Sequence, residues 1–208
     1  MSSPWLTIPL EDYEGHMRSP EVQQLSVLSE LFQYALDHSR PESVAILGVA
    51  GGNGLAQIVP AITKRIVGLD INPRYIDAVR QRFAFLPGLE LQTCDLTQQE
   101  LRLPTVSLVH AALIFEHAGL GLALTNALSL VAPEGRLSVV LQMASQQEPG
   151  VSSTDYPSMQ TLKHDFTLID IDQFRDLLTQ KNFQLVAQET RSLPAGKAFW
   201  LGLFARSA

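Results

Sequence analysis

The sequence predicts an α/β fold, a three-layer sandwich whose seven-stranded sheet is mostly parallel and ends in an antiparallel C-terminal hairpin. Short apolar runs alternate with segments of helical spacing five times, and this alternation is typical of a parallel sheet covered by helices on both faces. The last two apolar runs are joined only by residues 191–197. So short a link cannot hold a crossover helix, so these two strands must be antiparallel.

At 208 residues the chain is most simply one domain. We expect an N-terminal cap over residues 1–42, which carries a helix, and a core over residues 43–208, which contains the sheet. The prolines and the glycine of residues 1–19 predict an irregular segment. Ser19 is expected to cap the helix that follows, with Pro20 at its first position, and apolar residues at helical spacing would pack one face of that helix on the core.

The first half of the core predicts three strands, over residues 44–47, 66–69 and 89–93. The first two are short and almost wholly apolar, as in a sheet that is covered on both faces. Apolar residues recur at helical spacing over residues 55–62 and predict a helix directly after the first strand. The pair Asn72-Pro73 predicts the start of a helix after the second strand.

The second half of the core is predicted from the same signals. A long polar connection follows the fifth strand, and long loops of this kind are often binding elements. In chain order we expect a short helix over 97–101, a strand over 106–112, a helix over 119–131, a strand over 136–142, the polar connection over 144–168, a helix capped by Asp170 or Asp172, and hairpin strands over 183–189 and 198–205.

Composition narrows the classes of function. The chain is 46% hydrophobic and 17% charged with a net charge of −6, which predicts a folded protein without the basic face of a nucleic-acid binder. No apolar run approaches the roughly 18 residues of a membrane span, and the first residues lack a signal-peptide pattern. Cys94 is the only cysteine, which excludes an internal disulfide and favours a cytoplasmic protein. The five histidines show no metal-ligand spacing, so no metal is expected.

Ligands of such sheets bind at the carboxyl ends of the strands. A glycine-rich segment lies at the first of these ends, where it lets the backbone approach a ligand, and the helix expected after it would offer free N–H groups. This segment fails the G-x-G-x-x-G register of dinucleotide-binding proteins. The register requires glycine at its third position and a small residue at its last position. Counted from Gly48, the third position is Ala50, and counted from Gly52, the last position is Gln57. Asp70, at the end of the second strand, stands where a ribose could present its hydroxyl groups.

The pattern resembles the class I S-adenosylmethionine-dependent methyltransferases, which have a Rossmann-like core, from residue 44 to the C-terminus. Gly52 and Gly54 match the second and third glycines of the family's loop, whereas Gly48 replaces its acidic residue and Ala50 replaces its first glycine. The segments Gly68-Leu69-Asp70-Ile71-Asn72-Pro73 and Cys94-Asp95-Leu96 resemble the family's second and third strand ends. The terminal hairpin resembles the family's reversed seventh strand, which lies between strands five and six.

The resemblance implies S-adenosylmethionine as cofactor and methyl transfer to a small-molecule acceptor by in-line displacement. It implies that Asp70 takes both ribose hydroxyls and that Asp95 accepts from the adenine amino group. A carboxylate only accepts hydrogen bonds, which suits two vicinal O–H donors. The cofactor-binding residues implied in this way are Gly48, Ala50, Gly52, Asn53, Gly54, Asp70, Ile71, Asn72, Asp95, Leu96 and Ala111.

Methyl transfer needs a general base only when the acceptor must lose a proton. Glu116 and His117 follow the fourth strand, beside the expected sulfonium, and are the first catalytic candidates. A lid over the cofactor and substrate is the other expectation. Its candidate residues are Tyr13, His16 and Met17 of the N-terminal segment and Tyr156 of the polar connection.

Each of these residues also has a purely structural interpretation. The glycine segment could be a tight turn, Asp70 and Asp95 could cap helices, and Glu116 and His117 could be non-catalytic. At the level of function, the alternatives are a non-catalytic S-adenosylmethionine-binding protein and, less favoured, an NAD-linked oxidoreductase. Neither the methyl acceptor nor the oligomeric state is indicated by the sequence.

Overall fold

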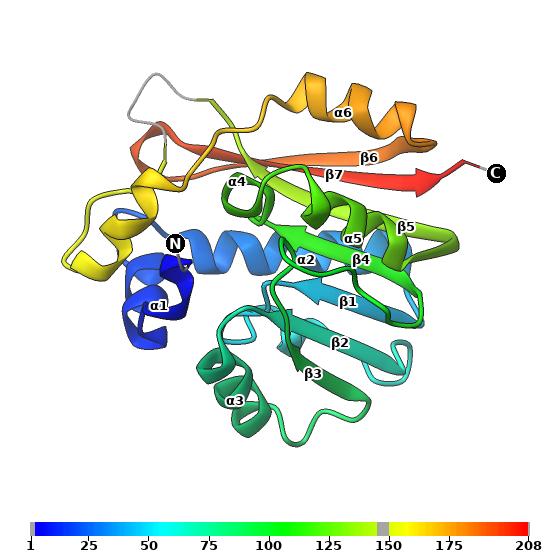
Figure 1. Cartoon of the computed structure of the whole chain (residues 1–208), viewed down its shortest axis with the longest axis horizontal. Coiled ribbons are helices and arrows are strands. Elements are labelled where there is room, and N and C mark those ends of the chain that lie inside the picture. The colour runs from blue at the N-terminus through cyan, green and yellow to red at the C-terminus, as the bar shows by residue number, and fades with distance from the viewer. Residues whose placement is uncertain (1–2, 145–149, 208) are drawn as a thin grey trace.

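A computed structural model describes residues 3–144 and 150–207. Its seven strands form one sheet in the order β3-β2-β1-β4-β5-β7-β6, in which β7 runs antiparallel to both of its neighbours and the other pairs are parallel (Figure 1). The predicted sheet and the reversed strand between strands five and six are therefore confirmed. The strands are β1 (Ser43–Leu47), β2 (Arg65–Asp70), β3 (Leu89–Thr93), β4 (Val106–Ala112), β5 (Val131–Gln142), β6 (Phe183–Ser192) and β7 (Ala198–Arg206).

Helices cover both faces of the sheet and give the three predicted layers. Helices α2 and α3 share one apolar cluster with one face, whereas α5 and α6 share a second cluster with the opposite face. No helix in residues 3–144 and 150–207 is long and apolar enough to cross a membrane. The helices are α1 (Leu10–Arg18), α2 (Gln24–Ser39), α3 (Pro73–Arg82), α4 (Phe115–Ala118), α5 (Leu122–Leu130) and α6 (Ile171–Gln180), with 3-10 helices η1 (Pro4–Leu6), η2 (Leu55–Gln57), η3 (Pro157–His164) and η4 (Pro194–Gly196).

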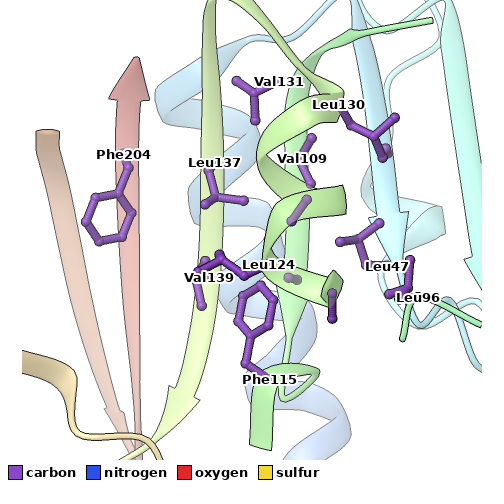
Figure 2. Packing of buried hydrophobic residues seen from close by; sticks show 14 of the residues in the cluster. Leu47, Leu96, Val109, Phe115, Leu124, Leu130, Val131, Leu137, Val139 and Phe204 are labelled. Atoms are coloured by element: carbon purple, nitrogen blue, oxygen red, sulfur yellow. The ribbon is translucent and has the colours of Figure 1, made fainter. Parts of the chain in front are cut away.

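The two clusters follow from the alternation of side chains along a strand. In β1, Val44 belongs to the cluster under α2, whereas Ala45 belongs to the cluster under α5. Figure 2 shows the second cluster, in which Phe115 and Leu124 lie close to Val139 of the sheet. Burying side chains of this size stabilises the fold by about 1.5–3 kcal/mol each, so this cluster holds the carboxyl ends of β4 and β5 firmly.

The predicted helix after β1 is wrong. The chain forms only the three-residue η2 and then turns into β2. Pro60 lies inside the segment with helical spacing, and proline removes a helical N–H and disfavours helical backbone at the residue before it. The free N–H groups of a helix start are consequently not available at the end of the glycine segment.

The N-terminal segment is helical rather than irregular. Pro9 has extended backbone and occupies the N-cap of α1, so a proline that looked like a helix breaker marks a helix start. The next helix, α2, begins at Gln24 and not after Ser19. Ser19 instead ends α1, because its backbone N–H donates to the carbonyl of His16.

Three further boundaries differ from the predictions. The expected helix over 97–101 is a turn, and the expected helix over 119–131 begins only at Leu122, as α5, because residues 119–121 separate it from the short α4 before it. Strand β5 begins at Val131, where an irregularity in its pairing with β4 accommodates residues 133–135. The expected caps of α3 and α6 are confirmed, since Asn72 and Asp170 each accept a backbone N–H in the first turn.

An N-terminal segment and the connection after β5 together cover the carboxyl ends of the parallel strands (Figure 1). We call residues 3–18 and 150–166 the cap. A small apolar cluster joins its two parts through Ile8, Met159 and Leu162. Hydrogen bonds fasten both parts of the cap to the core; Asn72 Nδ2 donates to the Trp5 carbonyl at 2.9 Å, and Lys197 Nζ donates to the Gly150 carbonyl at 2.7 Å.

Candidate cofactor and substrate site

A cavity of about 580 Å³ lies between the cap and the carboxyl ends of the parallel strands. This volume is typical of a small-molecule site. Its floor comes from the ends of β2, β4 and β5, represented by Asp70, Ala112 and Gln142. Its roof comes from cap residues such as Trp5 and Met159.

Asp70 is the most strongly held polar group of the cavity floor. One carboxylate oxygen accepts the Ala50 N–H at 2.9 Å, and the other accepts the Asn72 N–H at 2.8 Å. Burial raises the pKa of Asp70 to about 6, against the lowering effect of these backbone hydrogen bonds. The backbone N–H of Ile71 also favours the charged form. A carboxylate has about four acceptor positions, so Asp70 still has acceptor capacity for a ligand in the cavity.

The glycine-rich segment divides into a part at the cavity and a part that packs elsewhere. Gly48 and Ala50 line the cavity. Gly52 and Gly54 have positive φ angles and pack against aromatic rings of neighbouring helices, and Asn53 Nδ2 donates to the Leu25 carbonyl at 3.0 Å. The last three therefore shape the turn, and none of them lines the cavity.

Gly48 stands where the resembling family has an acidic residue, and the structure shows what fills that space. Gly48 has a φ angle of +72°, and a Cβ atom added there would lie 2.3 Å from Ile114 Cδ1. Side chains are disfavoured both by this backbone conformation and by the isoleucine. The apolar Ile114 thus lines the cavity at this position.

The second strand end and the third also reach the cavity. Ile71 lines it, whereas Asn72 is fully buried and caps α3. Asp95 and Leu96 line it as well, and Asp95 Oδ1 accepts the Thr97 N–H at 2.8 Å, which holds a turn where a helix was expected. Asp95 therefore has a local structural role beside any role toward a ligand.

Strand β4 presents a different residue from the one predicted. Ala111 is fully buried in the cluster under α5, and Ala112 lines the cavity in its place. Since side chains alternate along a strand, only one of two consecutive alanines can face a given side.

Glu116 and His117 lie at the same end of the cavity but differ in access. Glu116 is 1% exposed and does not line the cavity, and its Oε1 accepts the backbone N–H of Gln142 at 2.8 Å. Burial raises the pKa of Glu116 to about 7. His117 lines the cavity between the edges of Trp5 and Phe166, and burial lowers its pKa to about 4.

Three of the four lid candidates line the cavity, namely Tyr13, His16 and Met17 of α1. His16 Nδ1 lies 2.8 Å from Thr154 Oγ1, which links the two parts of the cap. Tyr156 does not line the cavity and packs against Gly15 instead.

Sequence reasoning missed Gln142 and Phe166, which line the cavity, and Lys197, which fastens the cap to β7. A glutamine at the end of an apolar strand and an aromatic residue in a polar connection give no signal of their own. Lys197 was the more visible, because it is a charged residue at the start of an almost wholly apolar strand.

No protein-family model matches the chain, and no curated protein matches it in sequence. Solved structures do. The N-methyltransferase NodS from Bradyrhizobium japonicum WM9, in complex with S-adenosyl-L-homocysteine, is similar over 100% of both chains, with a TM-score of 0.70 and 15% sequence identity.

Two other structures have comparable similarity. The magnesium protoporphyrin IX methyltransferase ChlM from Synechocystis PCC 6803, with bound S-adenosylhomocysteine, has a TM-score of 0.64 and 16% identity, covering 89% of this chain and 83% of its own. The [4+2]-cyclase SpnF has a TM-score of 0.67 and 10% identity, covering 92% and 84%. The sheet order, the reversed strand and these similarities show that the chain has the class I S-adenosylmethionine-dependent methyltransferase fold.

Proposed function

We propose that this protein transfers a methyl group from S-adenosylmethionine to a small-molecule acceptor. The observation that carries the proposal is Asp70, a buried carboxylate at the end of β2 that lines the cavity and keeps acceptor positions open toward it. Methyltransferases with this fold have been crystallised with S-adenosylhomocysteine, which supports the choice of cofactor.

The residues present fit such a donor. Asp70 would accept from both ribose hydroxyls, and Asp95 would accept from the adenine amino group beside Leu96. The backbone of Gly48, Ala50 and Ile71 would enclose the rest of the molecule, since all three line the cavity. When bound, the donor supplies a methyl group on a positively charged sulfur, and much of the rate then comes from alignment of the acceptor.

His117 is the residue of this chain best placed to take a proton from an acceptor. It lines the cavity, and with a pKa lowered to about 4 its imidazole is neutral at neutral pH. Glu116 would act through Gln142 rather than by contact, since it does not reach the cavity. Tyr13, His16 and Met17 would close over the bound molecules.

We further propose that residues 1–208 act as a single cytoplasmic domain, with residues 1–42 as an N-terminal lid and helix. The one cysteine, Cys94, is free and buried, which suits a reducing compartment. The two parts of the cap and the core all contribute residues to the same cavity, which supports treating them as one functional unit.

Calorimetric titration with S-adenosylhomocysteine tests the cofactor. We expect saturable binding by the natural protein and a loss of about 100-fold in affinity for Asp70→Ala, because two charge-assisted hydrogen bonds disappear. The matched control is Asp77→Ala, which removes an exposed aspartate of α3 that pairs with Arg80. The absence of binding by the natural protein would refute the proposal, and so would equal binding by the two variants.

A further inference from the structure

One acidic side chain of the cavity has no role toward the methyl donor. Asp70, Asp95 and Asp165 line the cavity. Under the proposed function, Asp70 and Asp95 would hold the ribose and the adenine at the ends of β2 and β3. Asp165 comes from the cap, where it directly follows η3. Its carboxylate is therefore left for the acceptor.

Asp165 is fixed at the β4 side of the cavity. The backbone N–H of Thr167, two residues further on, donates to the Glu116 carbonyl at 2.8 Å, which ties this end of the cap to α4. The negative charge of Asp165 reaches the His117 ring, because it opposes the larger lowering effect of burial on the His117 pKa. None of the ion pairs within residues 3–144 and 150–207 includes Asp165. This charge is thus available to a ligand.

Aromatic rings lie beside Asp165. Trp5, Tyr13, His117 and Phe166 all line the cavity. The rings of Trp5 and His117 meet edge-on with centroids 5.2 Å apart, and those of His117 and Phe166 do so at 5.6 Å. An edge-on pair covers at most one face of one of its two rings, so other ring faces remain uncovered by these contacts. The face of an aromatic ring attracts a cation.

The charges on the cavity wall favour a cation as well. In the described ranges no lysine or arginine lines the cavity. His16 and His117 line it, but burial lowers both pKa values to about 4, so both rings are uncharged at neutral pH. Lys197 does not line the cavity, and its Nζ donates to the Gly150 carbonyl and to Ser152 Oγ. Its charge acts on His16 and not on His117, so the side at Asp165 is negative.

We propose that the methyl acceptor is an amine with an apolar body, which binds as its ammonium ion beside Asp165 and the rings of Trp5 and Phe166. This inference rests on the proposed function and names the acceptor class for it. The ammonium group would donate to the Asp165 carboxylate. The apolar body would pack against Met159 and Leu162, whose buried side chains line the cavity. A carboxylate acceptor would be repelled by Asp165, and a neutral alcohol would gain less from its charge.

The nitrogen reacts as the free amine, because it needs its lone pair. The ammonium ion first gives one proton to the neutral His117 imidazole, which passes it to water, and the charge of Asp165 favours the protonated imidazole formed in between. The nitrogen lone pair then forms a bond to the methyl carbon while the bond from methyl to sulfur breaks and its electron pair stays on sulfur. The products are the methylated ammonium ion, S-adenosylhomocysteine and one proton.

Calorimetric titration of the full chain saturated with S-adenosylhomocysteine tests the acceptor class without any turnover. Saturation would occupy Asp70 and Asp95, so the probes meet only the rest of the cavity. Four probes share a phenethyl group, namely phenethylamine, phenethyltrimethylammonium, phenethyl alcohol and hydrocinnamate. We expect phenethylamine to bind at least about tenfold more tightly than the alcohol and the carboxylate, because both the opposite charge and the ring faces favour it. The trimethylammonium ion should be intermediate, since it keeps the charge but cannot donate a hydrogen bond.

Two variants locate the effect. Asp165→Asn keeps the size of the side chain but removes its charge, and it should weaken phenethylamine binding about three- to fivefold, because water partly screens a pair at an exposed carboxylate. Phe166→Leu keeps an apolar side chain but removes the ring, and it should weaken binding of both cations about threefold with less effect on phenethyl alcohol.

The control for the charge is Asp155→Asn, which removes an exposed carboxylate from the same connection but not from the cavity wall. It should leave phenethylamine binding within about twofold of the natural protein, because its charge is screened by water. Unchanged affinity for S-adenosylhomocysteine in each variant shows that it is folded.

The outcomes separate this proposal from the proposed function. Binding of S-adenosylhomocysteine, with phenethyl alcohol or hydrocinnamate bound as tightly as phenethylamine, overturns the amine assignment alone. Equal phenethylamine affinity in Asp165→Asn and Asp155→Asn also overturns it. Selective phenethylamine binding by a protein that does not bind S-adenosylhomocysteine supports the amine site and overturns the cofactor.

Discussion

Two buried carboxyl groups differ in their surroundings: Asp70 lines the cavity, whereas Glu116 lies behind the cavity wall. Asp70, at the end of β2, accepts a backbone N–H at both oxygens, whereas Glu116, after β4, accepts one at Oε1 and has no partner for Oε2 within residues 3–144 and 150–207. Burial raises both pKa values, that of Asp70 to about 6 and that of Glu116 to about 7. Backbone hydrogen bonds therefore favour the charged form more at Asp70.

The two sides of the cavity are therefore built in different ways. The side at β2 is organised by the chain itself, so its acid is oriented before any ligand arrives. The side at β4 and β5 contains Gln142 Nε2 and His117 Nδ1, which have no partner in residues 3–144 and 150–207. Under the proposed function, the first side would hold the methyl donor and the second would face its acceptor.

The largest expected effect is a loss of stability when the apolar cluster behind the β4 and β5 side of the cavity is disturbed. Phe115 is fully buried in the cluster shown in Figure 2 and directly precedes Glu116. Phe115→Ala should lower the free energy of unfolding by about 3–5 kcal/mol through the cavity that it leaves. Urea unfolding measures this loss, and a loss below about 1 kcal/mol would show that the cluster does not support this wall.

The next effect distinguishes Glu116 through pH. Its folded pKa is raised above the unfolded value of 4.5 to about 7, so the folded state binds the proton more tightly and stability falls as pH rises across that window. The shift corresponds to about 3 kcal/mol at neutral pH. Glu116→Gln can keep the hydrogen bond to Gln142 but cannot ionise.

The measurement is the difference in unfolding free energy between Glu116→Gln and the natural protein from pH 5 to pH 8. We expect the variant to gain stability relative to the natural protein as pH rises. The raised pKa of Asp70 also makes the stability of both proteins fall as pH rises. The lowered pKa values of His16, His110 and His117 make that stability rise with pH. These contributions are common to both proteins, so a difference that does not change with pH would contradict the assignment.

A smaller effect is expected at Gly48, where the glycine-rich segment packs against Ile114. Gly48→Ala should cost about 1–2 kcal/mol, because alanine is strained at positive φ and its Cβ would press on Ile114 Cδ1. Ile114→Val removes that atom. The double variant should therefore be more stable than the sum of the two single effects predicts, and strict additivity would show that Ile114 does not occupy this space.

The smallest effect tests Asp95 on the first side. Asp95→Asn keeps an oxygen for the Thr97 N–H but offers less to an adenine amino group. We expect S-adenosylhomocysteine affinity to fall about five- to tenfold with the unfolding free energy within about 0.5 kcal/mol of the natural value. Loss of stability with unchanged affinity would mean that Asp95 serves only the turn.

The sheet could be predicted because its signals are local. Strands such as β1 and β2 are short apolar runs between turn residues, and the link before β7, residues 193–197, is too short for anything but a hairpin. The prediction of a helix after β1 is wrong because Pro60, which has no backbone N–H, interrupts the segment with helical spacing. The helix α1 was missed because Pro9 was interpreted as a breaker and not as an N-cap.

The candidate site divides in the same way. Asp70 lies at the cavity because a strand end fixes its place, and Ala111 does not because the alternation of side chains was set one residue off. Gln142 could not be found from the sequence, since its importance depends on Glu116, which is 26 residues away and meets it only in the folded sheet. Local pattern thus predicts the donor side better than the acceptor side.

The most direct test of this division is a crystal structure of the complex with S-adenosylhomocysteine. We expect both ribose hydroxyl oxygens within about 3 Å of Asp70 carboxylate oxygens, with the donor making no hydrogen bond to the side chains of Gln142 and His117. A ribose placed away from Asp70, or a ligand that itself satisfies Gln142 and His117, would contradict the assignment of one side to the donor and the other to the acceptor.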